Sequence, residues 1–312
     1  MNSLHVHAAA AVVPRATRAL CSSSTLLFFN HTPNFLSTLN HFNIGLPNNI
    51  RHHNCSCFYR FNRSVAAELR SPDLVALEYA ELNLKEKVSE VGHVRIRQHV
   101  NPLSASLTIP VEVPNWNEVY GDSMLPLMVD IGSGSGRFLI WLARRFPESK
   151  NYLGLEIRDK LVKRAQFWVK ELALNNVYFM FANALVSFEQ LVSSYPGPLM
   201  LVSILCPDPH FKKRHHKRRV VQKPLVDSIL KNLHPGGWVF LQSDVLEVAL
   251  DMRNQFESHS DALEHITEID PSVLCDNEGW LLSNPMGIRT EREIHVEFEG
   301  AKLYRRMYQK RI

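Results

Sequence analysis

The stretch that decides the fold is Asp130-Ile-Gly132-Ser-Gly134-Ser-Gly136, which overlaps a short apolar run at residues 127–131 and opens into an apolar-faced helical pattern. Because glycine has no Cβ, the backbone can turn sharply there and approach a ligand closely. Free N–H groups at the start of the following helix favour a negative or polar ligand group. The stretch therefore predicts a strand, a ligand-binding loop and a helix, in that order.

The spacing of the glycines separates two kinds of cofactor. A dinucleotide-binding loop needs G-x-G-x-x-G, and Arg137 stands where the last glycine should be, so that interpretation fits poorly. Glu156 ends the next apolar run, 20 residues after Gly136, where a carboxylate can accept hydrogen bonds from both ribose hydroxyls of a nucleoside. The alternative is a plain glycine turn with an incidental acid. The acid-x-G-x-G-x-G spacing resembles the first motif of class I S-adenosylmethionine-dependent methyltransferases.

Beyond this loop, short apolar runs alternate with amphipathic helical patterns. The expected strands are 127–131, 152–156, 177–182, 199–205 and 238–243, and the expected helices are 138–146, 159–174, 188–193 and 220–233. This alternation predicts an α/β fold with a Rossmann-like, doubly wound and mostly parallel sheet, whose ligands bind at the carboxyl ends of the strands. An antiparallel strand is expected near residues 301–308.

The first 67 residues differ from the rest in composition. They contain no Asp, Glu or Lys, and all five of their positive charges are arginines. This composition is typical of an organelle transit peptide. A chloroplast destination is expected rather than a mitochondrial one, because no amphipathic arginine helix is evident. Residues 68–120 are expected to form an N-terminal extension, with helical spacing over 68–94, and residues 121–312 the methyltransferase domain.

Charge and composition exclude several classes of protein. The formal charge of +4 for the whole chain becomes −1 for residues 68–312, so the body is not globally basic. A chain with 45% hydrophobic and 21% charged residues suits a globular domain and excludes collagenous and disordered classes. The longest apolar run, 199–206, is about half of the ~18 residues that a membrane helix needs, so no membrane association is expected. Cys206 and Cys275 lack zinc or disulfide spacing, and Cys206 is interpreted as a buried thiol.

The fourth expected strand ends in Cys206-Pro207-Asp208-Pro209-His210. The two prolines restrict the backbone on both sides of Asp208 and would fix the direction of its carboxylate, unless the sequence is only a turn. After Phe211, six of the eight residues 212–219 are Lys or Arg. Beside a cofactor loop this basic segment predicts phosphate contacts, by Lys217, Arg218 and Arg219 in particular, rather than a solvated surface or a nuclear-import patch.

Together, the glycine loop, Leu155-Glu156-Ile157-Arg158, the Pro-Asp-Pro turn with its basic segment, and Ser243-Asp244 resemble the tRNA (guanine-N7)-methyltransferase family. The resemblance covers about residue 127 to the C-terminus. It implies S-adenosyl-L-methionine as the cofactor, tRNA as the substrate and Asp208 as the catalytic residue. The implied cofactor-binding residues are Asp130, Gly132, Gly134, Glu156, Arg158, Asn183, Ala184 and Leu205, and the implied substrate-binding residues are Lys212, Asp244, Thr290 and Glu293.

Four of these residues have structural alternatives. Thr290-x-x-Glu293 has the spacing of a helix capping box, Asn183 could cap a helix, and Asp244 could cap the helix expected near Leu246. The form of the basic segment at 214–219, Arg-His-His-Lys-Arg-Arg, resembles bacterial members of the family, which act without a partner. Eukaryotic cytosolic members work with a β-propeller subunit. A monomer without an obligatory protein partner is therefore expected.

The chemistry of guanine N7 limits what the protein must do. This atom carries a lone pair and no proton, so its attack on a sulfonium methyl group needs no general base. Orientation and charge stabilisation should therefore dominate, with Asp208 accepting hydrogen bonds from guanine N–H groups. Pro209-His210 departs from the Asn/Asp-Pro-Pro-aromatic turn of exocyclic-amine methyltransferases. The alternatives are a methyltransferase of another RNA and a non-catalytic RNA-binding protein with the same fold.

Overall fold

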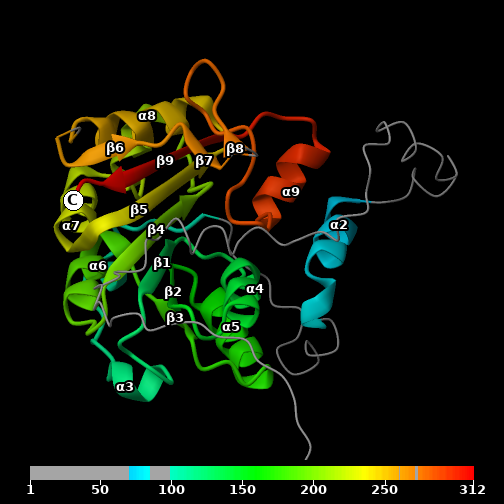
Figure 1. Ribbon diagram of the computed structural model, residues 1–312, viewed down its shortest axis with the longest axis vertical. Coiled ribbons are helices and arrows are strands. Elements are labelled where there is room, and N and C mark those ends of the chain that lie inside the picture. Colours follow the sequence, from blue (N-terminus) through cyan, green and yellow to red (C-terminus); the bar gives the residue numbers. More distant parts are fainter. Residues whose placement is uncertain (1–69, 85–98, 260, 271–272) are drawn as a thin grey trace, which may run out of the picture.

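The computed structural model describes residues 70–84, 99–259, 261–270 and 273–312, so the expected transit peptide lies outside the described residues. A seven-stranded sheet in the order β3-β2-β1-β4-β5-β9-β6 forms the centre of the molecule (Figure 1). The strands β1 to β5 pair in parallel, and β9 runs antiparallel to both β5 and β6. This confirms the predicted α/β fold, with its doubly wound, mostly parallel sheet and its antiparallel C-terminal strand.

The elements have the following bounds. The strands are β1 Leu127–Ile131, β2 Asn151–Glu156, β3 Val177–Phe181, β4 Leu199–Leu205, β5 Leu233–Ser243, β6 Leu263–His265, β7 Glu268–Asp270, β8 Val273–Leu274 and β9 Tyr304–Lys310. The α-helices are α2 Ser71–Glu78, α3 Trp116–Val119, α4 Arg137–Arg145, α5 Asp159–Glu171, α6 Ala184–Ser193, α7 Lys223–Asn232, α8 Leu246–Glu257 and α9 Glu291–Phe298. The short 3-10 helices in the described part of the chain are η3 Ala80–Leu82, η4 Ala105–Leu107 and η5 Lys213–Arg218.

Several boundaries differ from the expected ones for local reasons. The helix α6 begins four residues earlier than expected, because the Asn183 side chain caps it by accepting a hydrogen bond from the Leu185 amide. The helix α7 begins at Lys223 rather than at residue 220, since Gln222 is still extended and Pro224 occupies the first turn. Of the helix expected over 68–94, the described part is α2 and η3, which end at Asn83 in a left-handed conformation.

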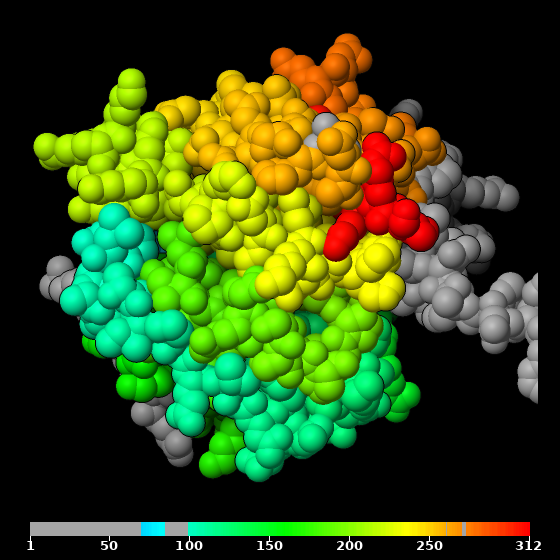
Figure 2. All heavy atoms as spheres, turned by 90° about the vertical axis from the view of Figure 1, so that its left-hand side faces the viewer, coloured from blue at the N-terminus to red at the C-terminus, as the bar shows by residue number. Residues whose placement is uncertain are grey.

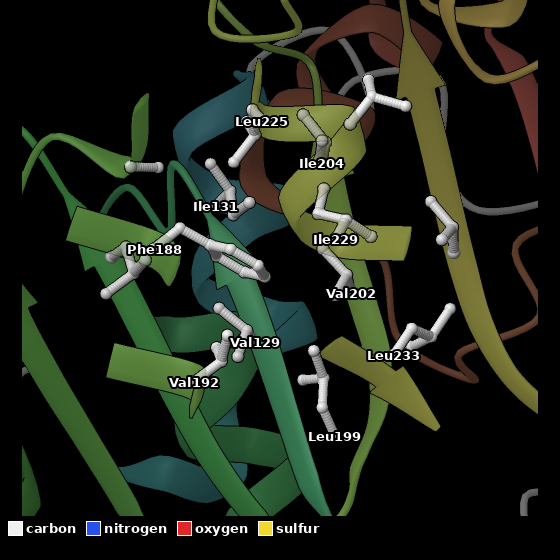
Figure 3. Packing of buried hydrophobic residues seen from close by; sticks show 14 of the residues in the cluster. Val129, Ile131, Phe188, Val192, Leu199, Val202, Ile204, Leu225, Ile229 and Leu233 are labelled. Atoms are coloured by element: carbon white, nitrogen blue, oxygen red, sulfur yellow. The ribbon is translucent and has the colours of Figure 1, made fainter. Parts of the chain in front are cut away.

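Helices cover both faces of the sheet, and each face has its own apolar cluster. Alternate residues of β1 point to opposite faces, so that Val129 joins one cluster and Met128 the other. Figure 3 shows the first cluster, in which side chains of β1 and β4 lie among those of α6 and α7. The second cluster joins the sheet to α4 and α5. The rigid sheet between these layers carries the loops at its carboxyl edge.

The described parts of the expected extension pack against the domain, and two of these contacts are with helices. The helix α2 lies beside α9 (Figure 1), where the Tyr79 hydroxyl donates to the Arg289 carbonyl and Glu78 pairs with the Arg289 guanidinium. Residues 99–113 contact α6, where the Val111 amide donates to Ser187 Oγ at 3.2 Å. The described residues before 121 therefore contact the start of α9 and also α6.

We expect Phe188→Ala to lower the free energy of unfolding by about 3–5 kcal/mol, because it leaves a cavity in the first cluster, where Phe188 is 1% exposed. Urea denaturation measures this change. The matched control is Phe298→Ala at a side chain that is 52% exposed, for which the change should stay within about 0.5 kcal/mol. Equal losses in both variants would contradict this account of the core.

Candidate active site

The glycine loop, residues 132–136, follows β1 and has open space on one side. Gly132, Gly134 and Gly136 all have positive φ, at 86°, 58° and 84°. A Cβ on Gly132 would meet no atom within 4 Å, and one on Gly134 would meet only the Gly132 carbonyl oxygen, at 3.9 Å. A Cβ on Gly136 would lie 2.8 Å from the Ala165 Cβ. The first two glycines thus leave room for a ligand, and the third allows close packing against α5.

Asp130 lies buried at the end of β1, directly before the loop. Its Oδ1 accepts a hydrogen bond from Ser203 Oγ of β4 at 2.7 Å. The pKa of the Asp130 carboxyl group is raised to about 7, mainly by burial. The Ser203 hydrogen bond opposes this shift, and the nearby Glu156 charge adds to it. Asp130 therefore changes its charge in the neutral pH range.

Glu156 ends β2 with its carboxylate beside the glycine loop. Its Oε2 accepts from the Gly134 amide at 2.8 Å and from Arg158 Nη2 at 2.9 Å. Its Oε1 accepts from the Arg158 amide at 3.0 Å and from Arg158 Nε at 2.9 Å. Since a carboxylate offers about four lone-pair sites, all of them are used. A ribose can reach Glu156 by displacing the Arg158 side chain, which is 30% exposed.

These residues fit S-adenosylmethionine. The open side of the glycine loop admits a nucleoside, and Glu156 can exchange its bonds to Arg158 for bonds to ribose hydroxyls. Asn183 is expected to contact adenine, but its side-chain amide has partners within the protein. Its Oδ1 caps α6, and its Nδ2 donates to the Pro102 and Leu107 carbonyls, both at 3.0 Å. Ala184 is buried at the start of α6, and Leu205, at the end of β4, packs against the second cluster.

Asp208 follows β4, between residues of unusual backbone geometry. Cys206 and His210 have positive φ, at 50° and 46°, which non-glycine residues rarely adopt. Asp208 Oδ2 lies 2.7 Å from His99 Nδ1, and its Oδ1 accepts from the His210 amide at 3.2 Å. Partial burial raises the pKa of Asp208, but the hydrogen bonds from His99 and His210 outweigh it and hold the pKa below its usual range. Asp208 is therefore a charged acceptor at neutral pH.

The Cys206 thiol has no sign of reactivity. Burial raises its pKa to about 12, so the nucleophilic thiolate is not populated at neutral pH. The sequence predicts a buried thiol; the residue as a whole is half-buried, and its Sγ accepts a hydrogen bond from Gln242 Nε2 at 3.6 Å. Within the described ranges, no group of three or more His, Cys, Asp or Glu residues could hold a metal ion. No helix in the same part of the chain is long and apolar enough to cross a bilayer.

The basic segment forms η5 and projects at the surface. The yellow-green segment in Figure 2 stands out from one corner of the molecule, beside the cyan segment that precedes the domain. The exposed cationic residues there are Lys212, Lys213, Arg214 and Lys217, and Arg218 is half-buried. The aromatic ring of Phe211, 70% exposed, immediately precedes them. This surface is suited to contact phosphates close to Asp208.

Arg219 is expected to contact phosphate, but the structure pairs it with carboxylates of the protein. Its side chain is 6% exposed and forms ion pairs with Glu247 at 2.8 Å and Asp251 at 3.0 Å, both on α8. The sequence predicts the same role for Arg219 as for Lys217 and Arg218, because the three cations are consecutive. The three-dimensional arrangement separates them, since Arg219 faces the protein.

Thr290 and Glu293 form the capping box of α9, the structural alternative. Thr290 Oγ1 accepts from the Glu293 amide at 3.2 Å, and Glu293 Oε2 accepts from the Thr290 amide at 3.3 Å. Glu293 is 1% exposed and also pairs with Arg305, so its carboxylate is engaged inside the protein. Thr290 is half-buried and serves as the N-cap. Asp244 does not cap α8, so that alternative is wrong, and its carboxylate pairs with Arg292.

Two further residues contact the site, and the sequence alone does not predict their roles. His99 reaches Asp208 from 109 residues earlier in the chain. Glu291, at the start of α9, contacts Ser135 Oγ and the Arg137 guanidinium, and so links α9 to the glycine loop. Glu291 lies inside the Thr290-x-x-Glu293 motif, but the spacing of this motif assigns a role only to Thr290 and Glu293. No local pattern marks His99.

Known proteins resemble this chain over the same region. The model of a family described as "Putative methyltransferase" matches residues 125–306. A tRNA (guanine-N(7)-)-methyltransferase from Synechococcus sp. (strain JA-2-3B'a(2-13)) is 51% identical over 203 residues, covering 65% of this chain and 79% of the relative. A protein of the same name from Microcystis aeruginosa is 44% identical over 223 residues, covering 71% of this chain and all of the relative.

The sheet order, the open glycine loop after β1 and the carboxylate at the end of β2 define a class I methyltransferase. Within that class, the identities and the coverage of the relatives assign the chain to a narrower group. This chain belongs to the tRNA (guanine-N7-)-methyltransferase family.

The raised pKa of Asp130 makes stability depend on pH. The unfolded chain releases this proton near pH 3.8, the ordinary value for an aspartate, whereas the folded chain retains it up to about pH 7. The free energy of unfolding should therefore decrease as the pH rises through this window, and Asp130→Asn should lack this contribution. Urea denaturation between about pH 4 and pH 7.5 measures the difference. The exposed control Asp261→Asn should keep the wild-type slope; an equal slope in Asp130→Asn would refute the assignment.

Proposed function

We propose that this chain methylates N7 of guanine in tRNA, at position 46 of the variable loop. The observation that carries the proposal is the position of Asp208. Its charged carboxylate lies at the carboxyl edge of the sheet, where β4 ends, next to the glycine loop and the exposed basic segment. The names of the relatives from Synechococcus and Microcystis support the same reaction.

The exposed cations provide the substrate-binding surface. Lys212, Lys213, Arg214 and Lys217 can each neutralise a phosphate, and the release of counterions then favours RNA binding. These residues lie close in sequence to Asp208, so that a phosphate held by them places a nearby base within reach of the carboxylate. Phe211 stands between the two groups with its ring accessible for stacking on a base.

Asp208 can orient guanine without accepting a proton from N7. A carboxylate offers about four lone-pair sites, and the hydrogen bonds from His99 and His210 use two of them. The remaining sites can accept the N1–H and the exocyclic N–H of guanine, which fixes the base and offsets the positive charge that develops on the ring. When bound, S-adenosylmethionine supplies the methyl group. The glycine loop and Glu156 would hold the nucleoside part of the cofactor.

Asp208→Ala should reduce single-turnover formation of 7-methylguanosine in tRNA by roughly 10²–10³-fold, because it removes a preorganised charge that faces the transition state. The affinity for S-adenosylmethionine should be retained, since Asp208 lies outside the glycine loop. Asp208→Asn should retain more of the orientation but lack the charge. Mass spectrometry of nucleosides from tRNA incubated with the purified full chain alone provides the measurement.

The same assay separates the alternatives. Near-wild-type rates in Asp208→Ala would make the Pro-Asp-Pro turn purely structural. Methylation of ribosomal RNA but not tRNA would favour another RNA methyltransferase, and RNA binding without methyl transfer would favour a non-catalytic protein. We further propose that the chain works as a monomer without an obligatory protein partner. Activity of the chain by itself would support the absence of such a partner, dependence on an added subunit would contradict it, and the mass of the chain in solution tests the monomer.

We also propose that residues 1–67 direct import into plastids. Their composition supports this destination, because they combine five arginines with no acidic residue, and the family match begins only at residue 125. A fluorescent reporter fused to residues 1–67 should enter plastids, and one fused to residues 68–312 should not. Import into mitochondria would favour the alternative destination, and retention in the cytosol would contradict targeting.

A further inference from the structure

Arg219 connects three parts of the molecule through one guanidinium group. Its Nε donates to the Pro209 carbonyl oxygen at 3.0 Å, so that it holds the backbone directly after Asp208. Its Nη1 donates to Asp251 Oδ2 at 3.0 Å and its Nη2 to Glu247 Oε1 at 2.8 Å. The Pro-Asp-Pro turn, the end of the basic segment and α8 are therefore joined at this point.

The other end of the same turn is attached to the sheet. The Cys206 amide donates to the Gln242 carbonyl of β5 at 2.7 Å. The Gln242 side chain accepts from Arg305 Nε of β9 at 2.9 Å, so this anchor belongs to the rigid interior of the sheet. Asp208 thus lies between two anchors, one on β5 and one on α8.

The conformation of the turn requires such anchors. Cys206 and His210 both adopt the left-handed region, and residues in this region keep that conformation only where their surroundings hold it. The prolines restrict φ at positions 207 and 209 but leave ψ free to vary, so they cannot by themselves fix the direction of the carboxylate between them. The hydrogen bond from Arg219 to the Pro209 carbonyl restrains the orientation of the peptide plane that follows Pro209.

We propose that Arg219 is a positioning residue, which fixes the direction of the Asp208 carboxylate by holding the Pro209 carbonyl against α8. This inference rests on the proposed function, in which Asp208 orients guanine. An arginine suits the task because its planar fork donates in several fixed directions at once, which a lysine cannot do. The basic segment then has two functions, with exposed cations facing RNA and Arg219 facing the catalytic turn.

The charges around Arg219 argue against a phosphate contact. Glu247 and Asp251 already neutralise the guanidinium, and His216 Nε2 lies 3.1 Å from its Nη2. A phosphate would have to approach two carboxylates and displace them from a side chain that is 6% exposed. Lys217, two residues earlier, is exposed.

Arg219→Lys tests the proposal because it keeps the positive charge and removes the fork. At saturating tRNA and cofactor, the single-turnover rate should fall roughly 10- to 100-fold, the scale for a catalytic group misplaced by about 1 Å. The affinities for tRNA and for S-adenosylmethionine should stay within about 2-fold, since the charge and the glycine loop are unchanged. A phosphate-binding Arg219 would instead leave the rate near that of the wild type.

A second variant weakens the same link from the other side. Glu247→Gln combined with Asp251→Asn leaves Arg219 in place but removes the carboxylates that hold it on α8. We expect the rate at saturating tRNA to fall in this variant as well. An unchanged or higher rate, with Arg219 released toward the RNA, would overturn the proposal.

Lys217→Ala is the matched control within the basic segment. Its effect should appear in tRNA affinity, with the magnitude of the salt slope of binding reduced by about 0.7–0.9 for one lost phosphate contact. Arg219→Lys should leave that slope as it is. The same reduction of the slope in Arg219→Lys would place Arg219 on the RNA and contradict its positioning role.

Amide hydrogen exchange of the full chain provides a readout that does not need activity. The His210 amide donates to Asp208 Oδ1, so its exchange should become faster in Arg219→Lys, whereas exchange in β4 should stay unchanged. If the wild type forms no 7-methylguanosine, the proposed function fails, and the exchange of His210 alone decides whether Arg219 holds the turn. Unchanged exchange at His210, or a loss of protection throughout β4, would overturn the proposal in favour of no role or a general structural one.

Discussion

The parallel pairing of β1 with β4 is the constraint on which the site depends. It places Asp130 opposite Ser203, and the hydrogen bond between their side chains joins the two strands just before they end. Because parallel strands end at the same edge of a sheet, the glycine loop after β1 and the Pro-Asp-Pro turn after β4 emerge side by side. A cofactor held by the first loop and a base held by the second can therefore meet without any movement of the sheet.

The cations near this edge are consecutive in sequence but differ in exposure, and the exposure decides what each of them contacts. The body of the chain carries a formal charge of −1, so the attraction for RNA is a local property of the basic segment. Its exposed side chains face solvent, whereas Arg219 is neutralised by Glu247 and Asp251. Because these carboxylates neutralise Arg219, it adds little to the electrostatic attraction for RNA. Its hydrogen bonds instead connect the Pro-Asp-Pro turn to α8.

Residues before and after the central strands complete the site. His99 from the expected extension contacts Asp208, and the Pro102 and Leu107 carbonyls occupy the Asn183 amide. On the other face, Glu291 of α9 contacts the glycine loop, and α2 packs on α9. The two loops are thus held by segments that lie far from them along the chain, which ties the geometry of the site to the stability of the whole domain.

By itself the sequence determined the fold class, the glycine loop, the strand-end carboxylate at Glu156 and the position of Asp208 after the fourth strand. These features follow from local backbone sterics and from the period of apolar residues, and both can be read over a few neighbouring positions. Tertiary structure decided that Arg219 faces α8, that Glu293 pairs with Arg305, that Asn183 is used inside the protein and that His99 reaches Asp208. Whether a polar side chain binds a ligand or another part of the chain depends on which distant groups surround it, and only the packing of the elements brings those groups together.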